Sequence, residues 1–226
     1  MDTEWLLGLL QVILINLVLS GDNAVVIAMA CRSLEPAQQK RAIFWGTFGA
    51  VFLRLVLTFI AVWLLRIPLV EAAGSLLLLY IAFKLLKGEE EEHAASGRLT
   101  MGQAIRTIVV ADLIMSLDNV IAVAGAAQGN WLLIVIGLGI SIPLIIWCSR
   151  LLTSIMNRYP ILVWLGAGLL GFTAGEMLVK DEWVHGWLEP WISDLPYLIP
   201  ALMCVLVILF GIATSRKSGK RMHGEG

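Results

Sequence analysis

The chain has 226 residues, of which 59% are hydrophobic and 15% are charged, and its formal net charge is −1. A soluble domain of this length does not need so much apolar surface, so the composition favours an integral membrane protein. The near-neutral charge excludes the broad basic surface typical of nucleic-acid-binding proteins, and we expect no nucleic-acid partner.

Seven apolar segments are long enough to cross the hydrocarbon core of a bilayer, which takes about 20 helical residues. They must be helices where they face lipid, because lipid offers no partner to an unpaired backbone group. In chain order they lie at about 5–31, 42–65, 68–87, 104–127, 131–153, 160–179 and 196–214. The N-terminus is acidic, with Asp2 and Glu4 in place of the basic residues of a signal peptide, so we expect the first segment to be a span.

Two of the connecting segments are polar in different ways. The segment 88–103 opens with a run of glutamates and is expected to be a solvated linker, with a metal-concentrating loop as the alternative. The segment 180–195 has tryptophans at a spacing of four with acids between them. This pattern predicts an amphipathic segment on the outer interface, with a substrate lid as the alternative.

Positive charge is distributed unevenly among the connections. Lysine and arginine concentrate in the first, third and fifth connections and in a basic tail at 215–226, whereas the other connections carry little. By the positive-inside rule, the N-terminus is expected outside and the C-terminus in the cytoplasm.

A short polar phrase occurs twice within the apolar segments. The first copy reads Asn16-Leu-Val-Leu-Ser20-Gly-Asp22-Asn23. The second copy reads Asp112-Leu-Ile-Met-Ser116-Leu-Asp118-Asn119. A carboxylate in hydrocarbon costs roughly 2.5–3.5 kcal/mol on insertion scales. Two Asp-Asn pairs at matching places therefore predict a polar function, and hydrogen bonding between helices without any substrate contact is the alternative.

The doubled phrase belongs to a longer internal similarity. One constant shift aligns the two phrases and also brings Arg54 onto Arg150; after a short contraction, Lys84 meets Glu176. Each half has three spans, and an odd number makes the halves enter the membrane from opposite sides. The sequence thus predicts an all-α integral membrane protein with seven transmembrane helices, built as a 3+3 inverted repeat (about 5–87 and 104–179) plus a C-terminal seventh helix.

Helical spacing places the amides and the serine of the first copy on one stripe and leaves Asp22 about 100° away. Either the helix opens locally, so that Asp22 and Asn23 both face inward, or Asp22 reaches another helix. Gly21 makes a local opening feasible. Leu117 occupies the corresponding place in the second copy, so the sequence does not predict a matching break there.

The available ligands are carboxylates, carboxamide oxygens and hydroxyls, a hard, oxygen-rich set suited to Mn²⁺, Mg²⁺ or Ca²⁺. The histidines lie outside the spans and the cysteines form no CxxC motif, which argues against a soft-metal pathway. The expected metal ligands are Asp22, Asn23, Asp112, Asp118 and Asn119. Coupling or supporting roles are expected for Asn16, Ser20, Ser116, Glu176, Arg54 and Lys84.

Three of the supporting residues carry charge inside a span. Arg54 lies near the middle of its span and is expected to be the counter-ion of Asp22 or Asp118. Glu176 is a candidate third acid or proton relay. Lys84 either pairs with Glu176 or extends to the cytoplasmic interface, and we expect the latter because its span ends soon afterwards.

The two phrases, with the Ala-Val-Val-Ile-Ala and Val-Ile-Ala sequences that follow them, resemble the TerC family of bacterial integral membrane proteins, and look closest to its short metal-transport branch. The resemblance covers essentially the whole chain. It implies a seven-helix fold related to the LysE superfamily and manganese efflux across the bacterial cytoplasmic membrane. Family acids correspond to Asp22, Asp112, Asp118 and Glu176, whereas Asn16 stands where many relatives have an acid.

We therefore expect a secondary transporter that exports Mn²⁺ by alternating access, with no enzymatic activity and no permanently bound cofactor. Export costs about 2.3 kcal/mol per charge per 100 mV. No nucleotide-binding motif is present, so counter-transport of H⁺ or Na⁺ would supply the energy, with protonation of Asp112 or Glu176 as the coupling step. The alternatives are a transporter of another cation or small solute, a membrane scaffold or insertion factor, and, more remotely, a membrane hydrolase. The sequence does not predict an oligomeric state.

Overall fold

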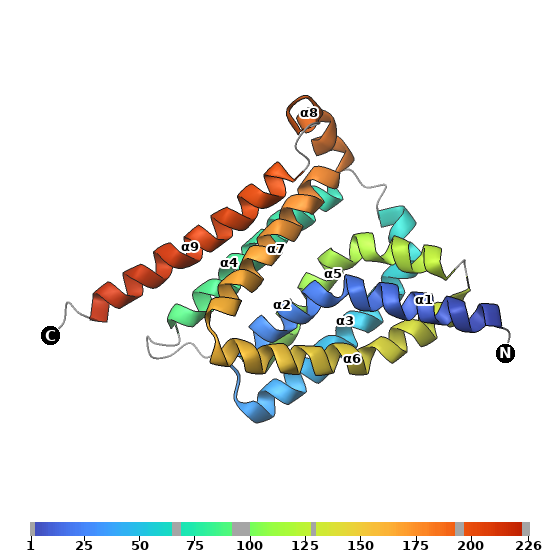
Figure 1. Cartoon of the computed structure of the whole chain (residues 1–226), viewed down its shortest axis with the longest axis horizontal. Helices are drawn as coiled ribbons and strands as arrows, with labels where there is room; N and C mark the ends of the chain where they lie inside the picture. The colour runs from blue at the N-terminus through green and yellow to red at the C-terminus, as the bar shows by residue number, and fades with distance from the viewer. Residues whose placement is uncertain (1–2, 65–68, 92–99, 128–129, 193–196, 223–226) are drawn as a thin grey trace. The chain divides into compact units, whose positions relative to one another are not determined.

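The computed structural model describes residues 3–64, 69–91, 100–127, 130–192 and 197–222, which form α-helices and turns without a strand (Figure 1). The helices are α1 (Thr3–Leu19), α2 (Gly21–Cys31), α3 (Pro36–Leu64), α4 (Val70–Glu91), α5 (Met101–Ala126), α6 (Trp131–Arg158), α7 (Ile161–Lys180), α8 (Glu182–Ile192) and α9 (Leu198–Met222). The predicted all-α architecture is confirmed for this part of the chain.

Three helical stretches are long and apolar enough to cross a membrane: Pro36–Ile60 in α3, Trp131–Arg158 and Ile161–Lys180. The number rises to five if α1 with α2, and the two segments of a bent α5, each count as one span. A shorter apolar stretch, Leu198–Ala213, lies in α9. The described residues thus support three to five spans. The seven-helix count, the inverted repeat and the orientation remain predictions.

The outward face of α3 shows why these helices need an apolar surrounding. It exposes a row of large apolar side chains, Phe44, Phe48, Phe52 and Phe59, near helical spacing. The opposite face is also apolar over most of its length, with Ala50 and Leu57 buried. A helix that is apolar on both faces is typical of a membrane span. In water, the exposed row would be an aggregation-prone patch.

The chain divides into two compact units. The first unit comprises Met1–Ile67 and Met101–Ser154, and therefore contains α1, α2, α3, α5 and most of α6. The second comprises Pro68–Thr100 and Ile155–Gly226, and contains α4, α7, α8 and α9. Each unit takes helices from both of the predicted repeats.

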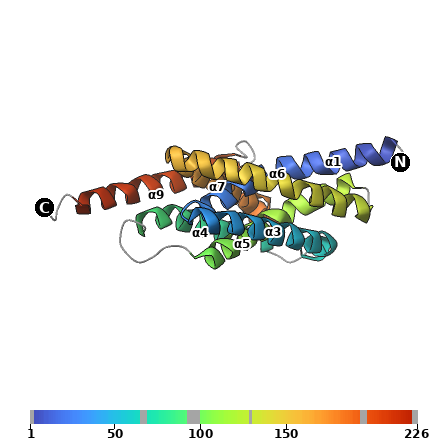
Figure 2. The same ribbon diagram turned by 90° about the horizontal axis from the view of Figure 1, so that it is seen from below.

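Close helix approaches at glycine hold the first unit together. α3 packs along α5, and a methyl group on Gly46 would lie 2.6 Å from Ile108 Cδ1. α1 approaches α6 (Figures 1 and 2), and Val12 fills the space beside Gly137. Small residues at such crossings are typical of helices packed in membranes. The packing turns the buried face of α3, which carries Arg54, toward α5.

In the second unit, α7 contacts both α4 and α9. Gly168, Gly171 and Gly175 lie where α7 faces α9, and a Cβ on Gly175 would be 2.5 Å from Pro200 Cα. Ser75 of α4 donates a hydrogen bond to the Ala174 carbonyl at 2.6 Å. The backbones of α7 and α9 therefore approach one another closely along one side of α7.

Asp181 joins three helices of the second unit. Its side chain is buried and follows the last residue of α7. Oδ2 accepts a hydrogen bond from the Ala72 N–H at 3.1 Å, at the start of α4. Oδ1 accepts from the N–H groups of Trp183 and Val184 at 3.1 and 3.3 Å, at the start of α8. One carboxylate thus satisfies first-turn donors of two helices, which otherwise lack partners.

The segments predicted as linkers are described in part. α4 continues through Glu91 into the acidic segment, and residues 92–99 lie outside the described residues. α8 occupies the tryptophan-rich connection and exposes Trp183 and Trp187, while the side chain of Trp191 lies outside the described residues. α9 covers most of the predicted seventh helix and continues into the segment predicted as a basic tail.

Candidate functional site

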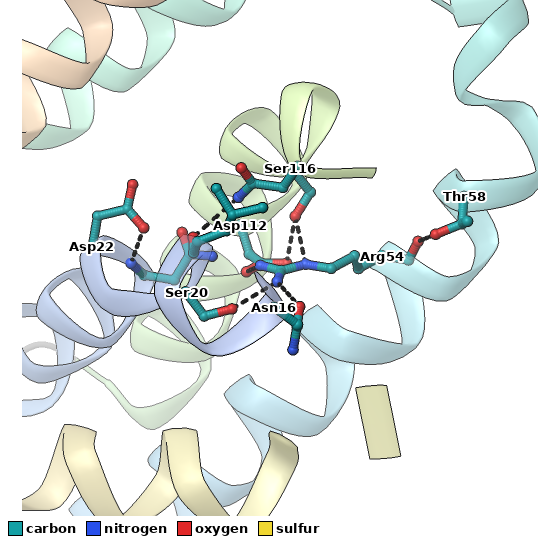
Figure 3. A network of polar contacts seen from close by, with 10 residues as sticks. Asn16, Ser20, Asp22, Arg54, Thr58, Asp112 and Ser116 are labelled. Carbon is teal, nitrogen blue, oxygen red and sulfur yellow. Dashed lines mark hydrogen bonds and ion pairs between the residues drawn. The ribbon is translucent and has the colours of Figure 1, made fainter. Parts of the chain in front are cut away.

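Arg54 lies at the centre of a buried polar group in the first unit, which Figure 3 shows. Its guanidinium donates hydrogen bonds to Asp112 Oδ1 at 2.5 Å, Asn16 Oδ1 at 2.8 Å, Ser20 Oγ at 2.8 Å and Ser116 Oγ at 2.9 Å. Arg54 is 1% exposed. A buried cation is tolerated only when it is both paired and hydrogen-bonded. The carboxylate supplies the opposite charge, and three neutral oxygens satisfy further N–H groups. We call these five residues the Arg54 cluster.

The partners of Arg54 come from matching places in the two phrases. Asn16 and Ser20 belong to the first copy and are four residues apart, one helical turn along the chain; Asp112 and Ser116 are the same distance apart in the second. Ser116 Oγ also donates to Asp112 Oδ2 at 3.1 Å. Arg54 of α3 therefore lies between two equivalent pairs of side chains. One pair comes from α1 and the turn that follows it, and the other pair comes from α5.

The first phrase interrupts its helix. α1 ends at Leu19 and α2 begins at Gly21, with a bend of 48° between their axes. Ser20 at the break has φ −101° and ψ 4°, a region open to ordinary residues, so the break does not require a left-handed glycine. The sequence made a local opening at Gly21 feasible, and the backbone turns at Ser20 beside it. α5 also bends, by 62° between Met101–Leu117 and Asn119–Ala126, where the sequence predicted no matching break.

The bend in the first phrase changes the partners of two backbone groups. In an unbroken helix, the Leu19 carbonyl would accept from the N–H of Asn23. In the structure, Asn23 N–H donates to Asp22 Oδ1 at 2.8 Å, and the Leu19 carbonyl accepts from Asn119 Nδ2 at 3.1 Å. A side chain of the second phrase thus completes the hydrogen bonding of the broken helix in the first.

Asp22, the aspartate of the first Asp-Asn pair, accepts no hydrogen bond from Arg54. Asp22 is half-buried, and Figure 3 shows it turned away from the guanidinium of Arg54. Among the described side chains, Arg54 forms its ion pair with Asp112 and not with Asp22, one of the two counter-ions predicted for it. The side chain of Asp118 lies outside the described residues, so its role as a ligand stays a prediction.

Several buried polar atoms near the cluster have no hydrogen-bond partner among the described side chains and backbone. Asn23 is 3% exposed, and neither Oδ1 nor Nδ2 of its carboxamide is bonded. Asn16 Nδ2 and Thr47 Oγ1 are unpaired as well. Buried polar atoms are nearly always paired, so such a concentration indicates a place that accommodates water or an ion.

Thr47 is a buried polar residue that was not predicted from the sequence. It lies on α3 about two helical turns before Arg54, and therefore on the same face. The available signal was this spacing: a threonine placed in register with an arginine in an otherwise apolar span. A β-branched hydroxyl residue alone is too common in membrane helices to attract attention.

The ligand chemistry of the first unit depends on oxygen. Among the described residues, no three side chains of histidine, cysteine, aspartate or glutamate lie close enough to hold a metal ion. The described side chains of the two phrases include the acids Asp22 and Asp112, with amide, hydroxyl and backbone oxygens near them. Such donors suit hard cations and do not suit Zn²⁺ or Cu⁺.

The remaining predicted residues lie in the second unit. Glu176 is half-buried on α7, and Lys84 is exposed on α4. The exposure of Lys84 agrees with a side chain that extends along its helix toward an interface. Neither residue belongs to the Arg54 cluster.

Comparison with known proteins places the chain in a family. It matches the profile of the "Integral membrane protein TerC family" over residues 1–220. It is 45% identical over 218 residues to "Uncharacterized membrane protein YjbE" of Bacillus subtilis, covering 94% of this chain and 97% of that protein. It is 26% identical over 220 residues to YkoY of the same organism, covering 82% of this chain and 68% of that protein.

A further relative is the UPF0053 protein YegH of Escherichia coli, 33% identical over 176 residues, with 69% of this chain and 33% of that longer protein covered. No solved structure matches the chain. The profile match along nearly the whole sequence and the 45% identity to YjbE show that the chain belongs to the TerC family of integral membrane proteins.

Proposed function

We propose that this protein is a secondary transporter that exports a divalent cation, Mn²⁺, across the bacterial cytoplasmic membrane by alternating access. One observation carries the proposal. Matching residues from the two copies of the polar phrase meet in a buried group. The buried carboxamide of Asn23, in the first phrase, has no hydrogen-bond partner among the residues that the structure describes. Packing between helices does not by itself require buried polar atoms that lack a hydrogen-bond partner.

Energetics supports a functional role for the cluster. A buried ion pair is often no more stabilising than well-packed apolar residues of the same volume. The unpaired carboxamide of Asn23 and hydroxyl of Thr47 are a further cost, since each buried polar atom without a partner destabilises a fold by about 1–3 kcal/mol. A site retained at this cost suits a protein that must bind a polar substrate inside the membrane.

The proposed ligands are the acids and amides of the two phrases. Asp22 and Asp118 would be the primary ligands, and Asn23, Asn119 and Asp112 would complete the oxygen shell. Manganese accepts this hard donor set. The energy for export would come from counter-transport of H⁺ or Na⁺, with Asp112 or Glu176 as the group that couples the two movements. The protein would hold no permanent cofactor and catalyse no reaction.

Flux measurements in proteoliposomes test the proposal. Purified protein is reconstituted, and Mn²⁺ movement is followed under an imposed pH or Na⁺ gradient, with Mg²⁺, Ca²⁺ and Zn²⁺ as competitors. Asp22→Asn and Asp118→Asn are expected to abolish flux, because each removes a charged ligand. Glu182→Gln, which neutralises an exposed acid on α8, is the matched control and should transport normally.

Normal Mn²⁺ flux in both aspartate variants would show that the site is wrongly assigned. Absence of Mn²⁺ flux in the wild-type protein under every gradient, together with co-purification of other membrane proteins, would favour a scaffold or insertion factor instead.

A further inference from the structure

We propose that Arg54 is a tethered cation that competes with the transported metal for Asp112 and the oxygens around it. This inference rests on the proposed function. In the conformation described, Arg54 occupies the position of a substrate cation, and the metal engages Asp112 only after the guanidinium has moved away.

The first argument is the overlap between what Arg54 binds and what a metal would bind. Every atom that accepts a hydrogen bond from the guanidinium is an oxygen: one carboxylate, one carboxamide and two hydroxyls. This is the donor set of a hard cation. Arg54 is thus held by the chemistry proposed for the substrate, at the place where the two phrases meet.

The second argument is electrostatic exclusion. Asp112 Oδ1 lies 2.5 Å from Arg54 Nη2, and Oδ2 accepts from Ser116, so both oxygens of the carboxylate are engaged. A divalent ion at Asp112 would stand within a few ångströms of the guanidinium charge in a buried, weakly screened setting. The two cations cannot share the carboxylate, so binding of one favours release of the other.

The third argument is that a displaced guanidinium has an acceptor available that is not a proposed metal ligand. Thr47 Oγ1 is buried and has no hydrogen-bond partner in the described part of the chain. Thr47 lies on the Arg54 face of α3, about two helical turns before Arg54. Arginine on a helix extends toward the N-terminal turn, which for Arg54 is the direction of Thr47.

The affinity of the purified full-length protein for Mn²⁺ alone tests the inference. Bound Mn²⁺ is measured by loss of the electron paramagnetic resonance signal of the free ion. Arg54→Gln is expected to bind Mn²⁺ at least tenfold more tightly, because Asp112 is released to the metal. In an Asp112→Asn background, the same substitution should change the affinity less than threefold, since there is no carboxylate left to compete for.

Arg54→Lys keeps the positive charge and extends the test to a variant that disturbs the fold less. Lysine makes fewer directed hydrogen bonds than arginine and therefore competes less well for Asp112. The Mn²⁺ affinity of Arg54→Lys is expected to lie between those of wild type and Arg54→Gln. Arg150→Gln is the matched control: the repeat aligns Arg150 with Arg54, but its side chain is exposed, and the affinity should not change.

Transport kinetics separate competition from a purely structural role. A competing arginine assists release of the metal, so Arg54→Gln should lower both the KM and the kcat of Mn²⁺ flux. A purely structural arginine predicts weaker binding and a raised KM. If wild type binds Mn²⁺ and neither Arg54 variant binds it more tightly, the competitor role is overturned while the proposed function stands. If no protein in the series binds Mn²⁺, the proposed function fails and this inference falls with it.

Discussion

The side-chain amide of Asn119 donates a hydrogen bond to the Leu19 carbonyl at 3.1 Å, across 100 residues of sequence. The donor belongs to the second polar phrase and the acceptor to the broken helix of the first. The two phrases therefore support one another structurally as well as sharing Arg54. Each of them would lose a hydrogen-bond partner if the other were altered.

Replacing Asn119 with aspartate should destabilise the first unit. Aspartate has nearly the same shape, but its ionised carboxylate cannot donate to the Leu19 carbonyl, and a lost hydrogen bond to a buried group costs about 1–3 kcal/mol. Thermal unfolding in detergent is expected to shift down by several degrees. Asn157→Asp, at an exposed position of α6, is the control and should leave the transition in place. Equal melting temperatures for Asn119→Asp and wild type would contradict this role.

Asp112→Leu alone should be among the most damaging substitutions in the first unit. It leaves Arg54 buried without its opposite charge, and breaking a buried pair from one side costs about 3–5 kcal/mol. Adding Arg54→Met should recover most of the lost stability, because both charges are then gone and the volumes are kept similar. The comparison is made by denaturant or thermal unfolding of the two variants. A double variant as unstable as the single one would show that the charge pair is not the source of the loss.

Thr47→Val should separate stability from transport. Valine keeps the shape of threonine and removes an unpaired buried hydroxyl, so the variant should be as stable as wild type or up to about 1–3 kcal/mol more stable. Mn²⁺ flux should fall several-fold if this oxygen receives a cation or the displaced guanidinium. Thr153→Val on α6 is the control, because its hydroxyl donates to the Ser149 carbonyl within its own helix. Loss of stability together with unchanged flux would contradict the assignment.

Asp181→Ala should loosen the starts of α4 and α8 together. The carboxylate accepts hydrogen bonds at both helix starts, and removal of one helix cap costs about 0.5–2 kcal/mol. The expected results are a lower melting temperature and an altered fluorescence of Trp183, which lies in the first turn of α8. Neutralising the adjacent exposed acid with Glu182→Gln should change neither. An unchanged melting temperature together with unchanged fluorescence in Asp181→Ala would show that the cap is dispensable.

Gly175→Ala should disturb the contact between α7 and α9. The added carbon would stand 2.5 Å from Pro200 Cα, and backbone cannot yield as a flexible side chain can, so a cost of about 1–3 kcal/mol is expected. Gly186→Ala on α8 is the control, because it makes the same substitution at a glycine with open space around it. Nothing lies within 4 Å of its new methyl group, and alanine favours a helix over glycine. Unfolding of the two variants should therefore move in opposite directions, and a shared direction would argue against the close approach.

Much of this arrangement could be predicted from local patterns. Apolar segment length predicts the helices, and the all-α architecture follows from the need to satisfy backbone groups in lipid. The doubled phrase indicated that Asn16, Ser20 and their counterparts act together. These features depend on spacing within one helix or on repetition along the chain, which a sequence displays directly.

The features that sequence reasoning missed depend on which helix faces meet. Arg54 pairs with Asp112 because α3 packs on α5 through Gly46, and no spacing rule states that contact. The turn occurs at Ser20 because its neighbour's carbonyl finds a donor on Asn119. Asp181 was assigned only to an acidic connection, since its helix partners lie far away in sequence. Tertiary neighbours decided each of these outcomes.

The pairing of Arg54 with Asp112 also has an electrical consequence. The positive charge of the guanidinium and the negative charge of the carboxylate cancel. An acid in place of Asn16 would give the Arg54 cluster one extra negative charge. A transmembrane voltage exerts a force only on net charge, so it does not pull on this pair when the pair moves as a unit. Substituting Asn16→Asp would give the group a net negative charge, and its movement through the field would then become sensitive to membrane potential.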